Sequence, residues 1–286
     1  MKILEETTGF PYLKSTGALF PGIGSEKEGM LSTVKAEFLE HLRQEAQTSS
    51  EIGVQLGIYA ASTSLWEKSR RKYDFSLLAG HSLGFYSALF ASGSINFQTG
   101  LYLIRTAHWA IMDVAGKQSF GMTAVNGINK VIVDRLCKRF KDLYISNINS
   151  SSQVVVSGLV ESLESFEKSI IKEGPLKIKR LTIRHPLHTP ILKGVSDIMK
   201  KSLSDIELRI PKIPVVDHTS GEIITSSGKL KDILIEQFSK RVIWMDVIRK
   251  MWHSGVRRFI EVGPRNILTS LTKKIVRDAE SLTLDR

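Results

Sequence analysis

The sequence has a single cysteine, Cys137, and no apolar run long enough to cross a lipid bilayer. One thiol excludes a disulfide framework and leaves no partner for a cysteine-based zinc site, so we expect a reducing compartment. A membrane-spanning helix needs about 18 consecutive apolar residues, and the first ten residues, MKILEETTGF, lack the apolar core of a secretory signal. We therefore expect a cytoplasmic protein with no membrane association.

Acidic residues are the scarcer charged class. The chain has 29 Asp and Glu against 40 Lys and Arg, which gives a formal net charge of +11. Such a charge attracts nucleic acids, anionic membranes and acidic proteins alike. The basic residues form short clusters scattered along the chain, and no helix-turn-helix, zinc or RNA-platform motif accompanies them. We therefore do not expect a nucleic-acid partner.

Internal repeats and low-complexity linkers are also absent, and buried strands alternate with helices instead. Short apolar runs bounded by turn residues predict strands, and longer amphipathic or apolar segments predict helices. Strands are predicted at 17–20, 74–80, 213–217 and 257–262, and helices at 31–46, 54–68, 85–93, 190–203 and 229–239. The polar stretch from Asp278 onward is expected to fray. The alternation predicts an α/β protein with a parallel sheet.

Residues 118–184 have a different rhythm, with the order strand, helix, strand, strand, helix, strand. This is the order of a ferredoxin-like split βαβ unit, and the segment is short enough to be an insertion. We therefore expect a small ferredoxin-like domain at 118–184, inserted into a large domain formed by residues 1–117 and 185–286.

The motif Gly80-His81-Ser82-Leu83-Gly84 lies between a predicted strand and a predicted helix. A G-x-S-x-G in that position predicts a nucleophile elbow, in which a tight turn presents the serine hydroxyl at the start of the helix. The free N–H groups there favour an oxyanion. A serine hydroxyl needs a nearby base, and the chain has seven histidines among which spacing alone does not choose.

Four motifs in a fixed order carry a resemblance: FPGIGS at 20–25, GHSLG at 80–84, HPLHT at 185–189 and EVGP at 261–264. In order and spacing they resemble the malonyl-CoA:acyl-carrier-protein transacylase family, which includes the acyltransferase domains of fatty-acid and polyketide synthases. The similarity extends from about residue 17 to 276. It implies an α/β-hydrolase-like large domain that carries the ferredoxin-like insert.

The resemblance also implies roles for individual residues. Ser82 matches the nucleophile, His188 the general base, and Gln237 the residue whose backbone carbonyl orients the imidazole. The backbone N–H groups of Leu83 and Ile23 would form the oxyanion hole.

Further residues are implied as substrate-binding. Gln55 matches a pocket glutamine, Asn149 a residue of the cleft between the domains, and His81 and Leu187 neighbours of the acyl site. His185 stays open between binding and surface. The substrates would be phosphopantetheine thioesters of coenzyme A and of an acyl carrier protein, whose acidity suits the basic chain. We expect a monomer that needs no metal and no bound cofactor.

The sequence departs from the family pattern at the positions that recognise the malonyl group. Members that transfer malonyl have an arginine 25 residues after the nucleophile, and that position is Ala107 here. Arg105 lies about 200° away around a helix, and His108 would substitute only if the helix were rotated. Phe85, which we count with Ala107 and His108 among the substrate-binding residues, replaces the usual glutamate after the elbow, and Ile23 replaces a glutamine. A buried, unpaired carboxylate costs several kcal/mol, so we expect an uncharged acyl group to be preferred over malonyl.

Two other functions stay open. In an acyl hydrolase, which edits stalled carrier proteins in polyketide pathways, water would take the acyl group from Ser82 with the same base. In a non-catalytic docking module, the fold would bind a carrier protein without chemistry; the intact pair of Ser82 and His188 argues against this alternative.

Overall fold

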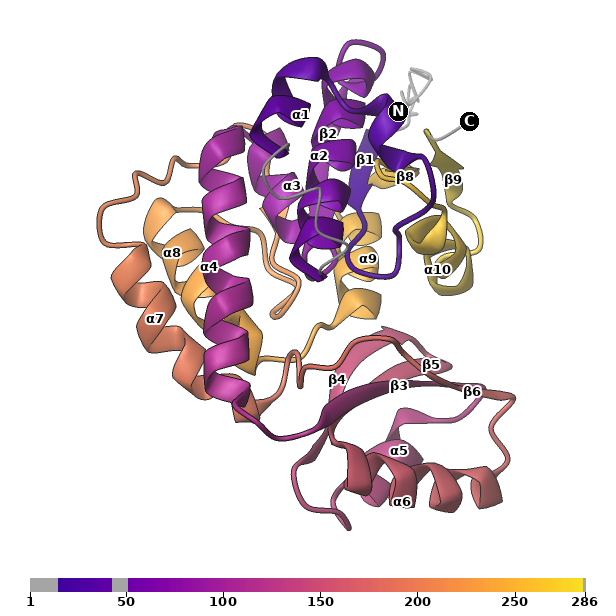
Figure 1. Ribbon diagram of the computed structural model, residues 1–286. Coiled ribbons are helices and arrows are strands. Elements are labelled where there is room, and N and C mark those ends of the chain that lie inside the picture. The colour runs from indigo at the N-terminus through magenta and orange to yellow at the C-terminus, as the bar shows by residue number, and fades with distance from the viewer. Residues whose placement is uncertain (1–14, 43–50, 285–286) are drawn as a thin grey trace, which may run out of the picture.

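The computed structural model describes residues 15–42 and 51–284, and its centre is a five-stranded sheet in the order β7-β2-β1-β8-β9 (Figure 1). All four strand pairs of this sheet are parallel. The strands are β1 (Ser15–Phe20), β2 (Phe75–Gly80), β7 (Val215–Val216), β8 (Val256–Glu261) and β9 (Glu280–Thr283). The carboxyl ends of β1, β2 and β8 therefore lie at one edge, where α/β proteins place their ligands.

Helices cover both faces of this sheet, because the parallel strands are apolar on both sides. Ala18 and Phe20 of β1 belong to a core cluster with α2, α3 and α4, whereas Leu19 belongs to a cluster with α9 and α10. The helices are α1 (Ala36–Leu42), α2 (Glu51–Ser69), α3 (Gly84–Ala91), α4 (Phe97–Ala115), α7 (Val195–Ser202), α8 (Ser227–Glu236), α9 (Trp244–His253) and α10 (Ile267–Ile275), with 3₁₀ turns η1 (Met30–Thr33), η3 (Pro190–Gly194) and η4 (Gln237–Ser239).

A second unit lies at one end of the molecule and has its own antiparallel sheet, in the order β4-β5-β3-β6 (Figure 1). Its elements are β3 (Phe120–Asn126), α5 (Lys130–Cys137), β4 (Leu143–Ser150), β5 (Gln153–Leu159), α6 (Val160–Ile170), η2 (Ile171–Glu173) and β6 (Lys177–Arg180). Apolar residues of both helices and of the sheet form a separate core. The order of elements is the one that the sequence predicts for 118–184.

Most predicted elements are present, but the C-terminal segment differs. Within the segment from Asp278, residues 280–283 are ordered as β9, which pairs in parallel with β8 and buries Ser281. Backbone hydrogen bonding at a sheet edge thus orders a segment whose composition is polar. The predicted helix at 31–46 begins as η1 and α1; residues 43–46 lie outside the described residues, as does the N-terminal decapeptide. Within the described ranges, no helix combines the length and hydropathy of a bilayer span.

Candidate active site

Ser82 occupies a strained turn between β2 and α3. Its φ is 53°, in the left-handed region that residues with a side chain rarely adopt. The turn is tight because both flanking glycines lie against backbone: a Cβ on Gly84 would collide with the carbonyl of Phe20, and one on Gly80 with the carbonyl of Gly84. The turn directs the Ser82 side chain away from the sheet and toward His188.

His188 lies within hydrogen-bond distance of this hydroxyl. The distance from its Nε2 to Ser82 Oγ is 2.7 Å. Its Nδ1 lies 3.0 Å from the carbonyl oxygen of Gln237 and 3.1 Å from that of Lys240. Carbonyl oxygens only accept hydrogen bonds, so Nδ1 carries the ring proton and Nε2 is free to accept a proton from Ser82. An imidazole held in this way can act as a general base.

Burial keeps this imidazole neutral. Only 5% of His188 is exposed, and loss of solvation, reinforced by the nearby His218, lowers the pKa of His188 to about 3. The two carbonyl contacts act in the opposite direction, because they stabilise an imidazolium. The ring is therefore an unprotonated base at neutral pH, and its charged form, once produced, has two acceptors at Nδ1.

Two backbone N–H groups lie beside Ser82. Leu83 precedes the first residue of α3, and Gly22 and Ile23 follow β1. The two segments pack closely, since a Cβ on Gly22 would come within 2.6 Å of the His81 carbonyl oxygen. Neither the Leu83 N–H nor the Ile23 N–H donates a hydrogen bond to another described residue. These two donors can hold an anionic oxygen bonded near Ser82.

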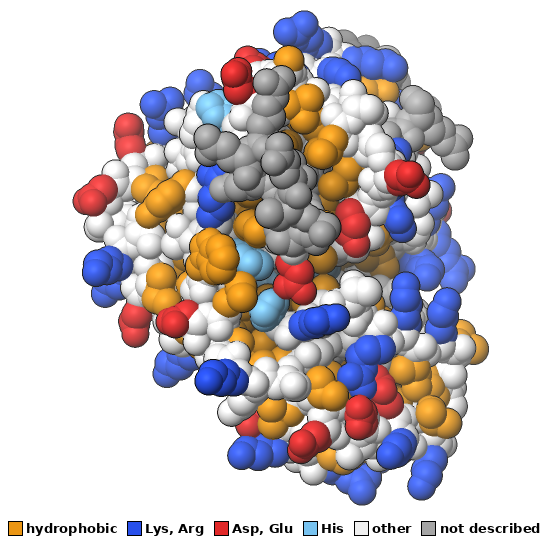
Figure 2. Space-filling view, in the orientation of Figure 1, with side chains coloured by type: hydrophobic (Ala, Val, Ile, Leu, Met, Phe, Trp, Pro, Cys, Tyr) orange, Lys and Arg blue, Asp and Glu red, His pale blue; other side chains and the backbone are white. Residues whose placement is uncertain are grey.

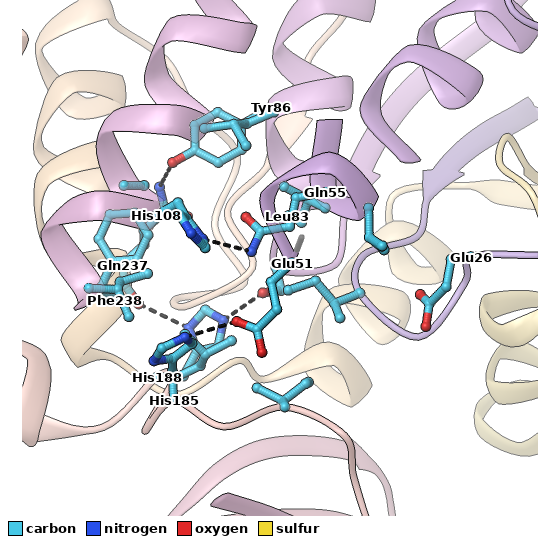
Figure 3. Close-up of a pocket in the computed structure, with 18 of the residues that line it drawn as sticks. Glu26, Glu51, Gln55, Leu83, Tyr86, His108, His185, His188, Gln237 and Phe238 are labelled. Carbon is cyan, nitrogen blue, oxygen red and sulfur yellow. Dashed lines mark hydrogen bonds and ion pairs between the residues drawn. The ribbon is translucent and has the colours of Figure 1, made fainter. Parts of the chain in front are cut away.

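A cavity of about 200 Å³ extends from Ser82 and His188 between α2, α3 and α4; we call it the α4 cavity (Figure 3). Most of its wall is apolar. Its lining includes Ile23, Val54, Leu83, Tyr86, Ile104, Ala107, Ile111, Ile183, Leu187 and Phe238. Several polar side chains pair on the wall: Gln55 Nε2 lies 3.3 Å from His108 Nδ1, His185 Nε2 lies 3.0 Å from Glu51 Oε2, and the Gln237 amide donates to the Tyr86 hydroxyl.

A second cavity of about 130 Å³ reaches Ser82 from the other side, between α10 and the antiparallel sheet; we call it the α10 cavity. One wall holds a chain of hydrogen bonds. His81 Nε2 lies 3.0 Å from Asn149 Oδ1, and Asn149 donates to Gln153. Gln153 in turn donates to Asn126 Oδ1 at 2.7 Å. Burial lowers the pKa of His81, so the neutral ring donates to Asn149. The α10 cavity thus offers fixed polar groups that can bind amides.

The structure places the predicted site residues in three groups. The α4 cavity is lined by Ile23, Gln55, Ser82, Leu83, Ala107, His108, Leu187, His188 and Gln237. The α10 cavity is lined by His81 and Asn149, together with Ser82, His188, Ile23 and Leu187. Phe85 lines neither cavity: it is fully buried, with its ring edge-on to His218 at 4.8 Å. Arg105 also lines neither, whereas His185, left open by the sequence, lines the α4 cavity.

The sequence did not indicate two other polar residues near the site. Gln153 continues the hydrogen-bond chain from Asn149, and a strand pattern does not reveal its partner. His218 is fully buried, with its ring centroid 5.9 Å from that of His188. No motif marks it, and it follows a strand far from both catalytic motifs in the chain.

Among the described residues, no group of three or more His, Cys, Asp or Glu is placed to hold a metal ion.

Comparisons with known proteins identify the family of the chain. The acyl transferase domain model matches residues 38–284. The chain is 28% identical to the malonyl CoA-acyl carrier protein transacylase of Salmonella typhimurium, over 90% of the chain and 92% of that protein. It is 29% identical to the polyketide biosynthesis protein PksE of Bacillus subtilis, over 93% of the chain but only 37% of that longer protein.

Solved structures show the same fold. An acyl carrier protein S-malonyltransferase from Vibrio cholerae superposes with a TM-score of 0.85 and 26% identity, covering 94% of this chain and 96% of that one. A malonyl-transacylase in complex with its type II polyketide synthase acyl-carrier protein superposes with a TM-score of 0.87 and 28% identity, covering 94% of each. The chain therefore belongs to the acyl transferase domain family and is an acyltransferase.

Proposed function

We propose that the chain transfers an acyl group between coenzyme A and an acyl carrier protein, in fatty-acid or polyketide biosynthesis, through an acyl-enzyme on Ser82. The observation that carries this proposal is the 2.7 Å contact between Ser82 Oγ and His188 Nε2, at the point where two cavities meet. The relatives named malonyl CoA-acyl carrier protein transacylase support the type of donor and acceptor.

The proposed reaction uses the groups around Ser82 in turn. His188 Nε2 takes the hydroxyl proton as Ser82 Oγ attacks the thioester carbon, and the N–H groups of Leu83 and Ile23 hold the oxyanion. The C–S bond then breaks, and the leaving thiolate takes the proton from His188. A second phosphopantetheine thiol gives its proton to His188 and attacks the acyl-serine, which releases the new thioester and restores Ser82. Two half-reactions of this kind give ping-pong kinetics.

Each cavity receives one part of the substrate in this proposal. The apolar α4 cavity holds the acyl chain, and the α10 cavity holds the phosphopantetheine arm. The arm contains amide groups, and the chain of His81, Asn149 and Gln153 offers both donors and acceptors to them. We also propose that the chain has two domains. They are a large α/β-hydrolase-like domain (1–117 and 185–286) and a ferredoxin-like domain (118–184), and the second cavity lies between them. The antiparallel order β4-β5-β3-β6 supports that division.

We further propose that an uncharged acyl group is preferred over malonyl. Ala107, 4% exposed, stands on the α4 cavity wall where the family resemblance places the arginine of malonyl-transferring members. Among the described residues that line this cavity, none is Lys or Arg, whereas Glu26 and Glu51 are present. A malonyl carboxylate in this cavity would lose its hydration without gaining a cationic partner.

An acidic carrier protein is the proposed macromolecular partner. The chain carries a formal net charge of +11. Figure 2 shows histidine side chains in a hollow between the two units, with Lys and Arg side chains gathered beside it. Complementary charge of this kind accelerates and orients association. The relative solved with its acyl-carrier protein supports this type of partner.

A carrier-protein assay tests the proposed function. The enzyme is mixed with butyryl-CoA and an acyl carrier protein bearing phosphopantetheine, and products are followed by mass spectrometry. We expect butyryl carrier protein to accumulate. Free butyrate in place of the transferred thioester would identify the alternative, an editing acyl hydrolase. No reaction, with carrier-protein binding retained, would identify a docking module. Both of these results would contradict transfer.

A further inference from the structure

One polar pair in the α4 cavity has no part in the proposed transfer of the acyl group at Ser82. His108, on α4 next to Ala107, is 6% exposed, and its Nδ1 lies 3.3 Å from Nε2 of Gln55 on α2 (Figure 3). Both side chains line the cavity. The two residues come from different helices and meet in a wall whose other α4 members, Ile104, Ala107 and Ile111, are apolar.

The contact with Gln55 determines which nitrogen of His108 carries the proton. An amide NH₂ group can only donate, so Nδ1 accepts and the proton of a neutral ring is on Nε2. The ring is neutral at pH 7, because burial and, secondarily, the neighbouring His185 lower the pKa of His108. Among residues 15–42 and 51–284, no group accepts a hydrogen bond from Nε2–H, and none donates to Gln55 Oε1.

The remaining polar side chains of this cavity are already paired or lie farther out. Glu51 and His185 bond to each other, and the Glu51 side chain is 46% exposed. The Gln237 amide donates to the hydroxyl of Tyr86. His108 and Gln55 therefore present one unused donor and one unused acceptor. Neither atom is among the buried polar atoms that lack a partner, so both open into the cavity, where a ligand atom can take the place of water. A ligand that satisfies both groups is favoured over one that displaces the water and leaves them without a partner.

We infer that His108 and Gln55 recognise an oxygen on the acyl chain, a hydroxyl or keto group beyond the thioester. This inference rests on the proposed function, since it assumes that the α4 cavity holds the acyl group. A hydroxyl or keto oxygen of the acyl chain can accept from His108 Nε2–H, and a chain hydroxyl within reach of Gln55 can donate to Gln55 Oε1. A carboxylate is not selected, because a neutral imidazole does not balance its charge and Glu26 and Glu51 repel it.

The test compares acyl chains of equal length that differ by one oxygen. Butyryl, 3-hydroxybutyryl, 4-hydroxybutyryl and acetoacetyl thioesters of pantetheine are offered to the full-length protein, and kcat/KM for acylation of Ser82 is followed by intact-protein mass. We expect at least one hydroxybutyryl isomer to be preferred about tenfold over butyryl. His108→Phe keeps an aromatic ring without the N–H and should remove this preference. Gln55→Leu should reduce it.

A neighbouring substitution serves as the matched control. Trp109 is 60% exposed, does not line the cavity, and packs edge-on against His108 with ring centroids 5.2 Å apart. Trp109→Phe should retain the preference for the oxygenated chain. Equal acylation by butyryl and every oxygenated chain, or a preference that survives in His108→Phe, would overturn this inference and leave the proposed function intact. Failure of all thioesters to acylate Ser82 would overturn both this inference and the proposed function.

Discussion

A His188→Ala variant is expected to lose about a thousandfold in kcat/KM for acylation of Ser82. His188 Nε2 is 2.7 Å from the hydroxyl, and among the described residues no other side chain contacts Ser82 Oγ through a hydrogen bond. Stopped-flow release of coenzyme A from butyryl-CoA measures the effect. His253→Ala is the control, since His253 is exposed and bonds the Arg249 carbonyl on α9.

The pH dependence of the same rate provides a second readout. Acylation requires the neutral form of His188, and its pKa of about 3 means that this form dominates from weakly acidic to neutral pH. We expect kcat/KM to stay level between pH 5 and 7 and to decline only at lower pH. A rate that falls with an apparent pKa near 6.5 would contradict a buried, neutral base. Retention of more than a tenth of the wild-type activity in His188→Ala would contradict the role of His188 as the base.

An Ala107→Arg variant is expected to raise the ratio of malonyl to butyryl acylation by about a hundredfold. In the wild type, a malonyl carboxylate would enter a wall of Ile104, Ala107 and Ile111 with no cationic partner among the described lining residues. A guanidinium at position 107 supplies two parallel donors and a positive charge for that carboxylate. Competition between malonyl-CoA and butyryl-CoA, read by intact-protein mass, measures the ratio.

The Ala107→Met variant is the control for side-chain size, because methionine fills space similar to that of arginine but carries no charge. This variant should leave the ratio low, whereas a rise equal to that of Ala107→Arg would show that shape rather than charge decides. A wild-type protein that loads malonyl as readily as butyryl would contradict the proposed preference directly. Both results can be read without knowledge of the natural acyl group.

Local patterns in the sequence predicted the fold well where structure is local. The buried run at 74–80, the glycines on either side of the serine and the apolar helix that follows correspond to β2, the elbow and α3. The βαββαβ order of the smaller unit was likewise readable from periodicity. The segment from Asp278 was not, because β9 is held by pairing with β8 rather than by its own apolar character.

The site depended on contacts between distant parts of the chain, which composition and spacing do not reveal. Periodicity did not distinguish His188 from the other histidines, and only the family resemblance selected it. Phe85 was expected to face substrate, but position i+3 after Ser82 points into the core toward His218. His108 was expected to need a rotated helix, yet adjacent positions 107 and 108 both line the cavity, since the cavity wall is broad enough for two neighbouring side chains of α4.

The most direct test of the central claim is the mass of the intact protein after it is mixed with butyryl-CoA and no acceptor thiol. The account predicts one added butyryl group on the wild type, mapped by peptide analysis to Ser82, and its removal when carrier protein is added. The Ser82→Ala variant should carry none. Catalysed transfer by Ser82→Ala, or an adduct at another residue that passes its butyryl group to the carrier, would contradict the claim.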